Sequence, residues 1–487
     1  MLHLAHAQTD RACGVLLGSA AGDALGAGYE FARVSPDLVP EMIGGGLGNF
    51  APGEWTDDTA QAVAIAQVVA TGRDLRDGES MDEIARGFAR WYAGDPPDVG
   101  IQTGAVLSRA GATPSAAAMT AAAREVHDRS GRSAGNGSLM RTGPVALAYL
   151  DDPEGCVETA MAISALTHFQ DHAQEACALW SLMIRHAVLT GEIPVFDDVA
   201  RWMPNAAVWR ERLRNAESRP PSDFATNGWA VGALQAAWSA IAHTPVPEAD
   251  PSRHLADALT TAIRIGHDTD TVAAIAGALL GARWGMTAVP ARWRRILHGW
   301  PVIDSRELER LAVLGVTRGE GTKYGWPAVE HIDYVPLQYG RPALARHPHD
   351  DGVWLAGATA LDRLPEDVDA VVTLCLTGRT QVPDGIEQIT FRLQDVADPE
   401  SNPNLDAVLL DAARTVRDLR REGRTVLVHC VAAHSRTPTV GIAYAMLRDV
   451  PLAEATAAVC RVLPAASPNA GFRAALARFD NRWRNVA

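Results

Sequence analysis

The pattern of the sequence changes near residue 320, and this change limits the folds that the chain can adopt. Before that point the chain is alanine-rich and contains long helical stretches, which are 58–69, 116–126, 174–189, 229–241 and 271–284. After it, short apolar runs typical of buried strands occur at 368–376, 388–393 and 425–429. They alternate with helical stretches at 405–421, 437–448, 452–462 and 470–481. We therefore expect a multidomain chain, all-α over 1–315 and α/β over 327–487, with a glycine-rich linker between the domains.

Net charge and apolar content restrict the partners of the chain. It carries 44 basic and 58 acidic residues, a net charge of −14, and 47% of its residues are hydrophobic, which is enough to build packed cores. The acid excess argues against nucleic acid as the main ligand, and it fits metal binding and plain solubility equally well. The most apolar run, 271–282, is shorter than the ~20 residues of a bilayer-spanning helix, so no membrane association is expected.

Cysteine usage and the N-terminal sequence bear on the compartment. The six cysteines are scattered and form no C-x-x-C pair, which is typical of reduced cytosolic thiols. The first residues, MLHLAHAQTD, lack the basic and then apolar pattern of a signal peptide. We expect a cytoplasmic protein.

Two acidic clusters each stand immediately before a long apolar helix. They are Thr56-Asp57-Asp58 and Asp268-Thr269-Asp270-Thr271. Helix capping explains one acid per helix. It does not explain two acids at each of two helices, because adjacent carboxylates repel each other. Four converging carboxylates, with threonine hydroxyls beside them, would suit two hard divalent cations.

Glycines at positions 14, 18, 22 and 26 recur every four residues, so they share one helix face and predict close helix packing. Together with the acidic clusters they belong to a larger set of motifs in 18–30 (GSAAGDALGAGYE), 55–60 (WTDDTA), 135–144 (GNGSLMRTGP), 167–168 (TH), 227–238 (NGWAVGALQAAW) and 266–282 (GHDTDTVAAIAGALLGA). In this order, the set resembles the ADP-ribosylglycohydrolase family, which includes the dinitrogenase reductase-activating glycohydrolases.

The resemblance implies an all-α fold that binds two Mg²⁺ or Mn²⁺ ions. It assigns metal ligation to Thr56, Asp57, Asp58, Asp268, Asp270 and Thr271. It places Glu30 near the substrate ribose as a catalytic residue, and it places a loop around the ADP-ribose, formed by Gly135, Asn136, Gly137 and Ser138. His168 is implied to lie near the substrate, and a structural histidine would fit the position equally well. Asp57, Asp270 and Glu30 all remain candidates for the base that activates water against the anomeric carbon.

A second motif lies in 425–437, which reads TVLVHCVAAHSRT. An apolar strand ends at His429, and Cys430 is followed six residues later by Arg436 and then by a helix. Loop amides and a helix N-terminus bind an anion and lower the pKa of a thiol, and arginine holds two phosphate oxygens. A buried, inert cysteine is the alternative. The strand before the motif and the helix after it favour a phosphate site.

This region, with 354–364, 368–375 and 467–480, resembles the dual-specificity and tyrosine phosphatases. The resemblance implies that Cys430 is the nucleophile, that Arg436 binds phosphate and that Thr437 assists the thiol. A general acid is expected upstream of the cysteine, with Asp395 as the first choice and Asp398 as the alternative. Either aspartate would otherwise be a turn-forming surface residue.

The loop departs from the phosphatase pattern at one position. Its usual glycine is replaced by Ala433, and alanine restricts both a positive φ and close approach of the ligand. We expect the substitution to affect the rate and substrate range of the phosphatase rather than its nucleophile.

These observations predict a bifunctional hydrolase. One domain would remove ADP-ribose from protein, with arginine as the expected acceptor, and the other would dephosphorylate a protein or a small phosphate ester. One alternative is a glycohydrolase whose second domain only binds phosphate or directs targeting. Others are an enzyme acting on a free ADP-ribose derivative and a chain in which both domains are ligand-binding scaffolds.

Overall fold

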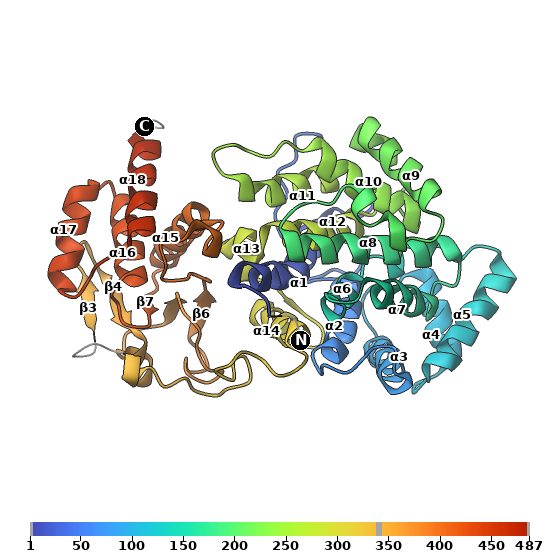
Figure 1. Ribbon diagram of the computed structural model, residues 1–487, viewed down its shortest axis with the longest axis horizontal. Coiled ribbons are helices and arrows are strands. Elements are labelled where there is room, and N and C mark those ends of the chain that lie inside the picture. The colour runs from blue at the N-terminus through green and yellow to red at the C-terminus, as the bar shows by residue number, and fades with distance from the viewer. Residues whose placement is uncertain (1–2, 338–342, 485–487) are drawn as a thin grey trace. The chain divides into compact units, whose positions relative to one another are not determined.

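The computed structural model describes residues 3–337 and 343–484, and the chain forms two compact units. The first contains 1–289 and 293–320, and the second contains 290–292 and 321–487. The first unit is helix-rich and the second combines a β-sheet with helices (Figure 1). The predicted succession of an α-helical and an α/β domain is confirmed.

Two glycine-rich helices form the centre of the first unit. They are α1 (His6–Gly26) and α12 (Thr269–Trp284). A β-carbon added to Gly14 would lie 2.2 Å from the carbonyl oxygen of Gly281, and one added to Gly26 would lie 2.5 Å from the Cα of Asp270. The helices therefore run antiparallel at backbone contact, which confirms the packing predicted from the glycine spacing. This packing brings the C-terminal end of α1 to the N-terminus of α12.

Other helices surround this pair, and those predicted from the sequence are all present. Before residue 320 they are α2 (Asp57–Val69), α3 (Gly78–Ala93), α4 (Ile101–Ala110), α5 (Ala116–Ser130), α6 (Gly143–Ala148), α7 (Pro153–Ala165), α8 (Asp171–Thr190), α9 (Ala206–Ser218), α10 (Ala230–His243), α11 (His254–Arg264), α13 (Ala291–Arg294) and α14 (Ser305–Val316). A short hairpin of β1 (His298–Gly299) and β2 (Ile303–Asp304) was not predicted. Its strands are too short to produce an apolar alternation.

The second unit is built on a five-stranded sheet with the order β3-β4-β7-β5-β6. The strands are β3 (Leu344–His347), β4 (Asp350–Gly357), β5 (Ala370–Thr373), β6 (Glu387–Thr390) and β7 (Val426–Cys430). Edge strand β3 is antiparallel to β4, and the other pairs are parallel. The three strands predicted from apolar runs are β5, β6 and β7, and they join β3 and β4 in one sheet with β7 at its centre.

Helices cover one face of this sheet. They are α15 (Leu405–Arg421), α16 (Arg436–Met446), α17 (Leu452–Val462) and α18 (Ala470–Arg484). Val426 and Val428 of β7 belong to the core beneath these helices, whereas Leu427 belongs to a smaller core on the opposite face. Because β7 is central and runs directly into the loop before α16, it places Cys430 at the carboxyl edge of the sheet, where ligands of such sheets bind.

Among the described residues, no helix combines the length and the apolar character that crossing a bilayer requires.

Candidate functional sites

The two acidic clusters meet where the N-termini of α2 and α12 come together. The N-cap residues are Thr56 and Asp268, and neither side chain makes a capping hydrogen bond. Instead, the Thr56 hydroxyl lies 3.2 Å from Oδ2 of Asp58 and 3.4 Å from Oδ2 of Asp270. The Thr271 hydroxyl lies 3.3 Å from the same Asp58 oxygen. Capping therefore does not account for these residues, because each helix directs its polar side chains at those of the other.

Asp23 of α1 holds the turn before α2 in place, a role not predicted from the sequence. It is fully buried, and its Oδ1 accepts a hydrogen bond from the Thr56 amide at 2.9 Å. Its Oδ2 accepts hydrogen bonds from the amide and the hydroxyl of Thr59, at 2.9 and 2.6 Å. The signal was a single acid between Gly22 and Gly26, within an otherwise small and apolar helix segment.

Two groups of carboxylates each have oxygen atoms within 4.8 Å of one another. One is Asp23, Asp58 and Asp270, and the other is Glu30, Asp268 and Asp270. Asp23 is already bonded to the turn, so it is a supporting residue rather than a free ligand. Asp57 is in neither group; its Oδ2 instead accepts a hydrogen bond from Gln61 at 2.9 Å.

Burial raises the pKa of every carboxyl group in this cluster, and repulsion between neighbouring carboxylates raises it further for all of them except Asp23. Burial raises the pKa of Asp23 to about 6. Burial, and then the charge of Asp268, raises the pKa of Glu30 to about 8. Burial is also the first cause of a raised pKa at Asp57, Asp58, Asp268 and Asp270. A bound cation would favour the charged form of all these groups.

The acids retain free oxygen atoms that suit such a cation. Oδ1 of Asp58 and Oδ1 of Asp270 are buried, and no hydrogen bond from the described residues reaches either atom. Leaving a buried carboxylate oxygen unpaired costs free energy unless something else neutralises it. Hard divalent cations prefer oxygen ligands of this kind, so the donor set fits Mg²⁺ or Mn²⁺.

The predicted substrate loop, 135–138, contacts the acids through Asn136, whose Nδ2 donates to Oδ2 of Asp268 at 2.8 Å. The ring of His168 packs against the loop glycines. A β-carbon on Gly135 would lie 3.2 Å from Nε2 of His168, and one on Gly137 would lie 3.1 Å from Cε1. A side chain at either position would crowd the ring, so the glycines favour this close approach. The structure thus brings together the loop, the histidine and the acidic cluster, as the sequence predicted.

A buried hydrogen-bonded chain links His168 to the acids through residues that sequence reasoning missed. Arg141 is fully buried, and it donates to Oε1 of Gln61, which in turn bonds Asp57. Its Nη2 donates to the Thr167 hydroxyl at 2.6 Å, and that hydroxyl lies 2.7 Å from Nδ1 of His168. Burial, and then the positive charge of Arg141, lowers the pKa of His168, so its ring is neutral. We infer that the Thr167 hydroxyl donates to Nδ1, which leaves the ring hydrogen on Nε2, facing the loop.

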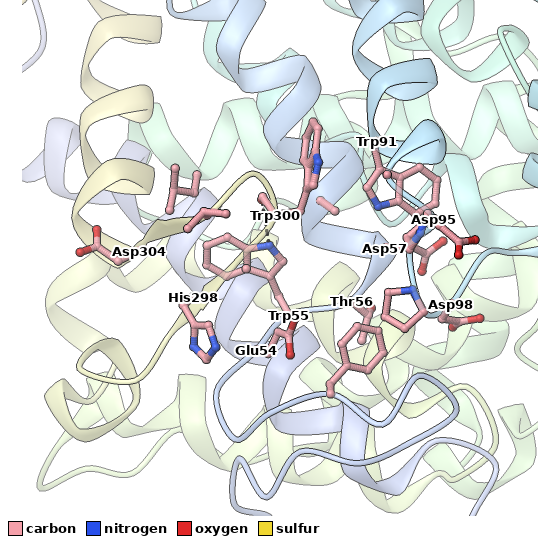
Figure 2. Close-up of a pocket in the computed structure, with 18 of the residues that line it drawn as sticks. Glu54, Trp55, Thr56, Asp57, Trp91, Asp95, Asp98, His298, Trp300 and Asp304 are labelled. Carbon is pink, nitrogen blue, oxygen red and sulfur yellow. Dashed lines mark hydrogen bonds between the residues drawn. The ribbon is translucent and has the colours of Figure 1, made fainter. Parts of the chain in front are cut away.

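A cavity of about 700 Å³ opens on another side of the cluster, beside Thr56 and Asp57. Figure 2 shows Trp91, Asp95 and Asp98 on the same side of the cavity as these two residues. The opposite side includes Trp55, Trp300, Glu54, His298 and Asp304 (Figure 2). The cavity wall is thus both acidic and aromatic.

A second candidate site lies in the other unit, in the loop between β7 and α16. Cys430 ends β7 and is 1% exposed, so little of the thiol is reached by solvent. Ala433 has φ of 52°, in the left-handed region that favours glycine, and it is buried. The loop therefore adopts the backbone that glycine would allow, at a cost of about 1–2 kcal/mol.

Arg436, the first residue of α16, faces the predicted general acid. Its Nη1 donates to the carbonyl oxygens of Leu374 and Leu393, at 2.8 and 3.1 Å. Its Nε is buried and has no hydrogen-bond acceptor among the described residues. This nitrogen lies 3.7 Å from Oδ2 of Asp395. Asp395 is further held by Asn469, whose Nδ2 donates to Oδ1 at 3.1 Å. The predicted acid and arginine thus lie together.

The other two predicted residues of this site have structural contacts. Asp398 accepts hydrogen bonds from the amides of Glu400 and Ser401 and forms a turn, which is the alternative role considered for it. The hydroxyl of Thr437 donates to the carbonyl oxygen of Ala356 at 3.2 Å. Asp395 is therefore the better placed of the two candidate acids.

Comparison with known proteins gives a match for each unit. Residues 4–322 match the ADP-ribosylglycohydrolase family, and 367–482 match the dual specificity phosphatase catalytic domain. The ADP-ribosylarginine hydrolase Tri1 of Pseudomonas putida is 30% identical over 296 residues, which is 58% of this chain and 73% of that protein. The ADP-ribosyl-(dinitrogen reductase) glycohydrolase of Rhodospirillum rubrum is 29% identical, over 58% of this chain and 89% of that protein. The crystal structure of human DUSP28 is 24% identical and covers 30% of this chain and 99% of that one, with a TM-score of 0.28.

Proposed function

Because the chain belongs to the ADP-ribosylglycohydrolase family, we propose that its first domain hydrolyses the bond between ADP-ribose and a protein side chain, with arginine as the acceptor. The observation that carries the proposal is the meeting of the acids of α2 and α12 beside the substrate loop. The name of the P. putida relative, an ADP-ribosylarginine hydrolase, supports the choice of acceptor.

Two Mg²⁺ or Mn²⁺ ions would be held by the side chains that converge there. These are Thr56, Asp57, Asp58, Asp268, Asp270 and Thr271, and Glu30 lies within reach of the second acid group. When bound, such ions supply Lewis acidity that lowers the pKa of water and holds vicinal ribose hydroxyls. Asp23 contributes by fixing the turn that presents the α2 acids.

The protein's own residues would then position the ADP-ribose and handle protons. The 135–138 loop would lie along the ADP-ribose, and the neutral, buried ring of His168 packs against the loop glycines and would hold the loop in place. Water oxygen bonds to the anomeric carbon, the C–N bond breaks, and the arginine guanidine leaves with a proton. Asp57, Asp270 and Glu30 are the candidate bases for the proton of the attacking water.

A release assay on the full chain tests this function. Peptides bearing arginine-linked and serine-linked ADP-ribose, and ADP-ribosylated nucleic acid, are incubated with Mg²⁺ or Mn²⁺, and free ADP-ribose is measured. Release from the arginine peptide is expected. The absence of release from all three substrates, with metal shown to be bound by calorimetry, would overturn the proposal.

For the second domain, we propose a cysteine-dependent phosphatase acting on a phosphoprotein or a small phosphate ester. The Cys430 thiolate would attack phosphorus, and Asp395 would protonate the leaving oxygen, giving a phosphocysteine that water hydrolyses. Arg436 would hold two phosphate oxygens. What supports this is the placement of Arg436 against Asp395, with a buried, unbonded Nε.

Hydrolysis of p-nitrophenyl phosphate separates this phosphatase from a domain that only binds phosphate. We expect wild-type activity that Cys430→Ser abolishes and that Cys460→Ser, a change at a half-buried cysteine of α17, leaves intact. Wild-type protein that binds phosphate but never turns over the ester would support the binding-module alternative.

A further inference from the structure

The cavity beside Asp57 touches the acidic cluster on a different side from the substrate loop. The loop meets the cluster through Asn136 and Asp268, whereas the cavity meets it through Thr56 and Asp57. If ADP-ribose lies along the loop, its glycosidic bond is at the acids and the other side of that bond faces the cavity. The cavity is therefore placed where the acceptor side chain would lie.

The charges around the cavity exclude a phosphate group and favour a cation. Among the described lining residues none is lysine or arginine. Six carboxylates line the cavity, and they belong to Glu54, Asp57, Asp95, Asp98, Asp304 and Glu307. An anionic diphosphate would be repelled by this wall. The ADP portion of the substrate thus belongs to the loop, and a positively charged group belongs here.

Four of these carboxylates already have partners within the protein, and one of them is Asp57, which accepts a hydrogen bond from Gln61. Glu54 accepts a hydrogen bond from the Ala51 amide at 2.8 Å, Asp304 caps α14, and Glu307 pairs with Arg310.

Asp98 accepts a hydrogen bond from the Val99 amide, and no ion pair from the described part of the chain neutralises the charge of Asp95 or Asp98. Asp98 is half-buried and close enough to Asp57 and Glu30 for its charge to raise the pKa of both. A half-buried, uncompensated acid so close to other acids is stabilised by a cationic ligand.

The aromatic walls indicate the shape of that cation. Trp300 is half-buried and offers ring surface to the cavity, whereas Trp55 and Trp91, which also line it, are each 2% exposed (Figure 2). Aromatic faces attract cations, and the planar guanidinium stacks on them better than the compact, strongly hydrated ammonium group does. Asp57 forms the inner wall of the cavity. It is 9% exposed and borders both the cavity and the acidic cluster.

We propose that this cavity is the acceptor pocket, in which the guanidinium of the modified arginine lies against Trp300 and pairs with Asp95 and Asp98. The inference rests on the proposed glycohydrolase function and adds to it the residues that select the acceptor. It predicts that arginine is preferred to neutral acceptors because its charge is bound before the bond is broken.

Binding of two matched probes to the full chain, loaded with Mg²⁺, tests the pocket without turnover. N-acetyl-arginine methylamide is compared with N-acetyl-citrulline methylamide, which has nearly the same shape and no charge. Quenching of tryptophan fluorescence and isothermal calorimetry report binding. We expect the arginine amide to bind at least about tenfold more tightly, a typical effect of losing a charged pair. Equal affinity for the two amides would overturn the pocket.

Asp98→Asn and Asp95→Asn test the two counter-ions. Asparagine keeps the size of each side chain, and it tolerates the positive φ of 51° at Asp95. Each change is expected to raise KM for the ADP-ribosyl-arginine peptide about tenfold, with a smaller effect on kcat, and to weaken binding of the arginine amide equally. Asp128→Asn, at an exposed acid of α5 far from the lining, is the control and should change neither value.

Two further readouts separate the possible failures. Affinity for Mg²⁺ should be unchanged in Asp98→Asn, and a marked loss of it would mean that Asp98 acts through the metal and not on the acceptor. If wild-type protein releases ADP-ribose from the arginine peptide but both variants keep wild-type KM, the pocket is wrong and the proposed function stands. If wild-type protein releases nothing from any linkage, the proposed function itself fails.

Discussion

Removal of divalent metal should make the stability of the first domain fall as the pH rises. In the metal-free protein, burial raises the pKa of Asp23 from 3.8 to about 6, and that of Glu30 is raised to about 8. A raised pKa means that the folded state holds a proton that the unfolded state has already released. Between the two pKa values the folded state binds more protons, so the free energy of unfolding decreases with increasing pH.

The size of this effect follows from Asp23 alone. A difference of about two pH units corresponds to about 3 kcal/mol lost between pH 4 and pH 7, at 1.36 kcal/mol per unit. For a domain of this size that is a shift in Tm on the order of 5 °C or more. Asp57, Asp58, Asp268 and Asp270 add to it in the same direction. A bound cation pairs with the charged carboxylates, so Mg²⁺ should stabilise the protein more at pH 8 than at pH 5.

Tryptophan fluorescence measures mainly the first domain, because ten of the thirteen tryptophans lie in the first unit. The full chain is dialysed against EDTA, and thermal unfolding is followed from pH 5 to pH 8 with and without Mg²⁺. Asp270→Asn should flatten the metal-free pH profile and reduce the Mg²⁺ shift. The reasoning is refuted if metal-free stability is constant or rises over this range, or if Mg²⁺ raises Tm equally at both ends.

Three further changes test other parts of the structure. Gly281→Ala would place its β-carbon 1.8 Å from the carbonyl oxygen of Gly14, so α1 and α12 must separate. We expect the free energy of unfolding, measured in urea, to fall by about 3 kcal/mol. A fall of less than about 0.5 kcal/mol would contradict the packing. Arg141→Met removes the centre of the buried hydrogen-bonded chain between His168 and Asp57. It should lower the free energy of unfolding by about 3 kcal/mol and raise the pKa of His168, measured by histidine NMR titration. An unchanged pKa would show that the charge of Arg141 does not act on His168. Ala433→Gly relieves left-handed strain, but glycine loses more backbone entropy on folding and this largely offsets the gain. Stability should therefore stay within about 0.5 kcal/mol of wild type, while p-nitrophenyl phosphate turnover should rise. A drop in both would show that the alanine is required.

Much of the fold follows from patterns that are local in the sequence. Glycines four residues apart predicted the face on which α1 packs, and the structure places those glycines at backbone contact with α12. Strands β5, β6 and β7 were also predicted, because each is a short apolar run between turns. The β1–β2 hairpin was not, since each of its strands has two residues and carries no periodicity.

The residues that support the first site were harder to predict, because their partners are distant in sequence. Gln61 stands four residues after Asp57 on α2, a spacing visible in the sequence, but its link to Arg141 spans 80 positions. Asp98 lies in a loop between α3 and α4, and only the folded chain brings it beside Asp57. Sequence reasoning identified the residues of local motifs and missed those that tertiary packing brings to them.

The most direct test of two independent hydrolase sites in one chain is a crossed experiment with two variants. Asp270→Asn and Cys430→Ser are each assayed, in the full chain with Mg²⁺, for release of ADP-ribose from an arginine-linked peptide and for hydrolysis of p-nitrophenyl phosphate. We expect Asp270→Asn to lose only the first activity and Cys430→Ser to lose only the second, with EDTA reproducing the loss seen in Asp270→Asn. Release of ADP-ribose that persists both in EDTA and in Asp270→Asn would contradict the role of the acidic cluster.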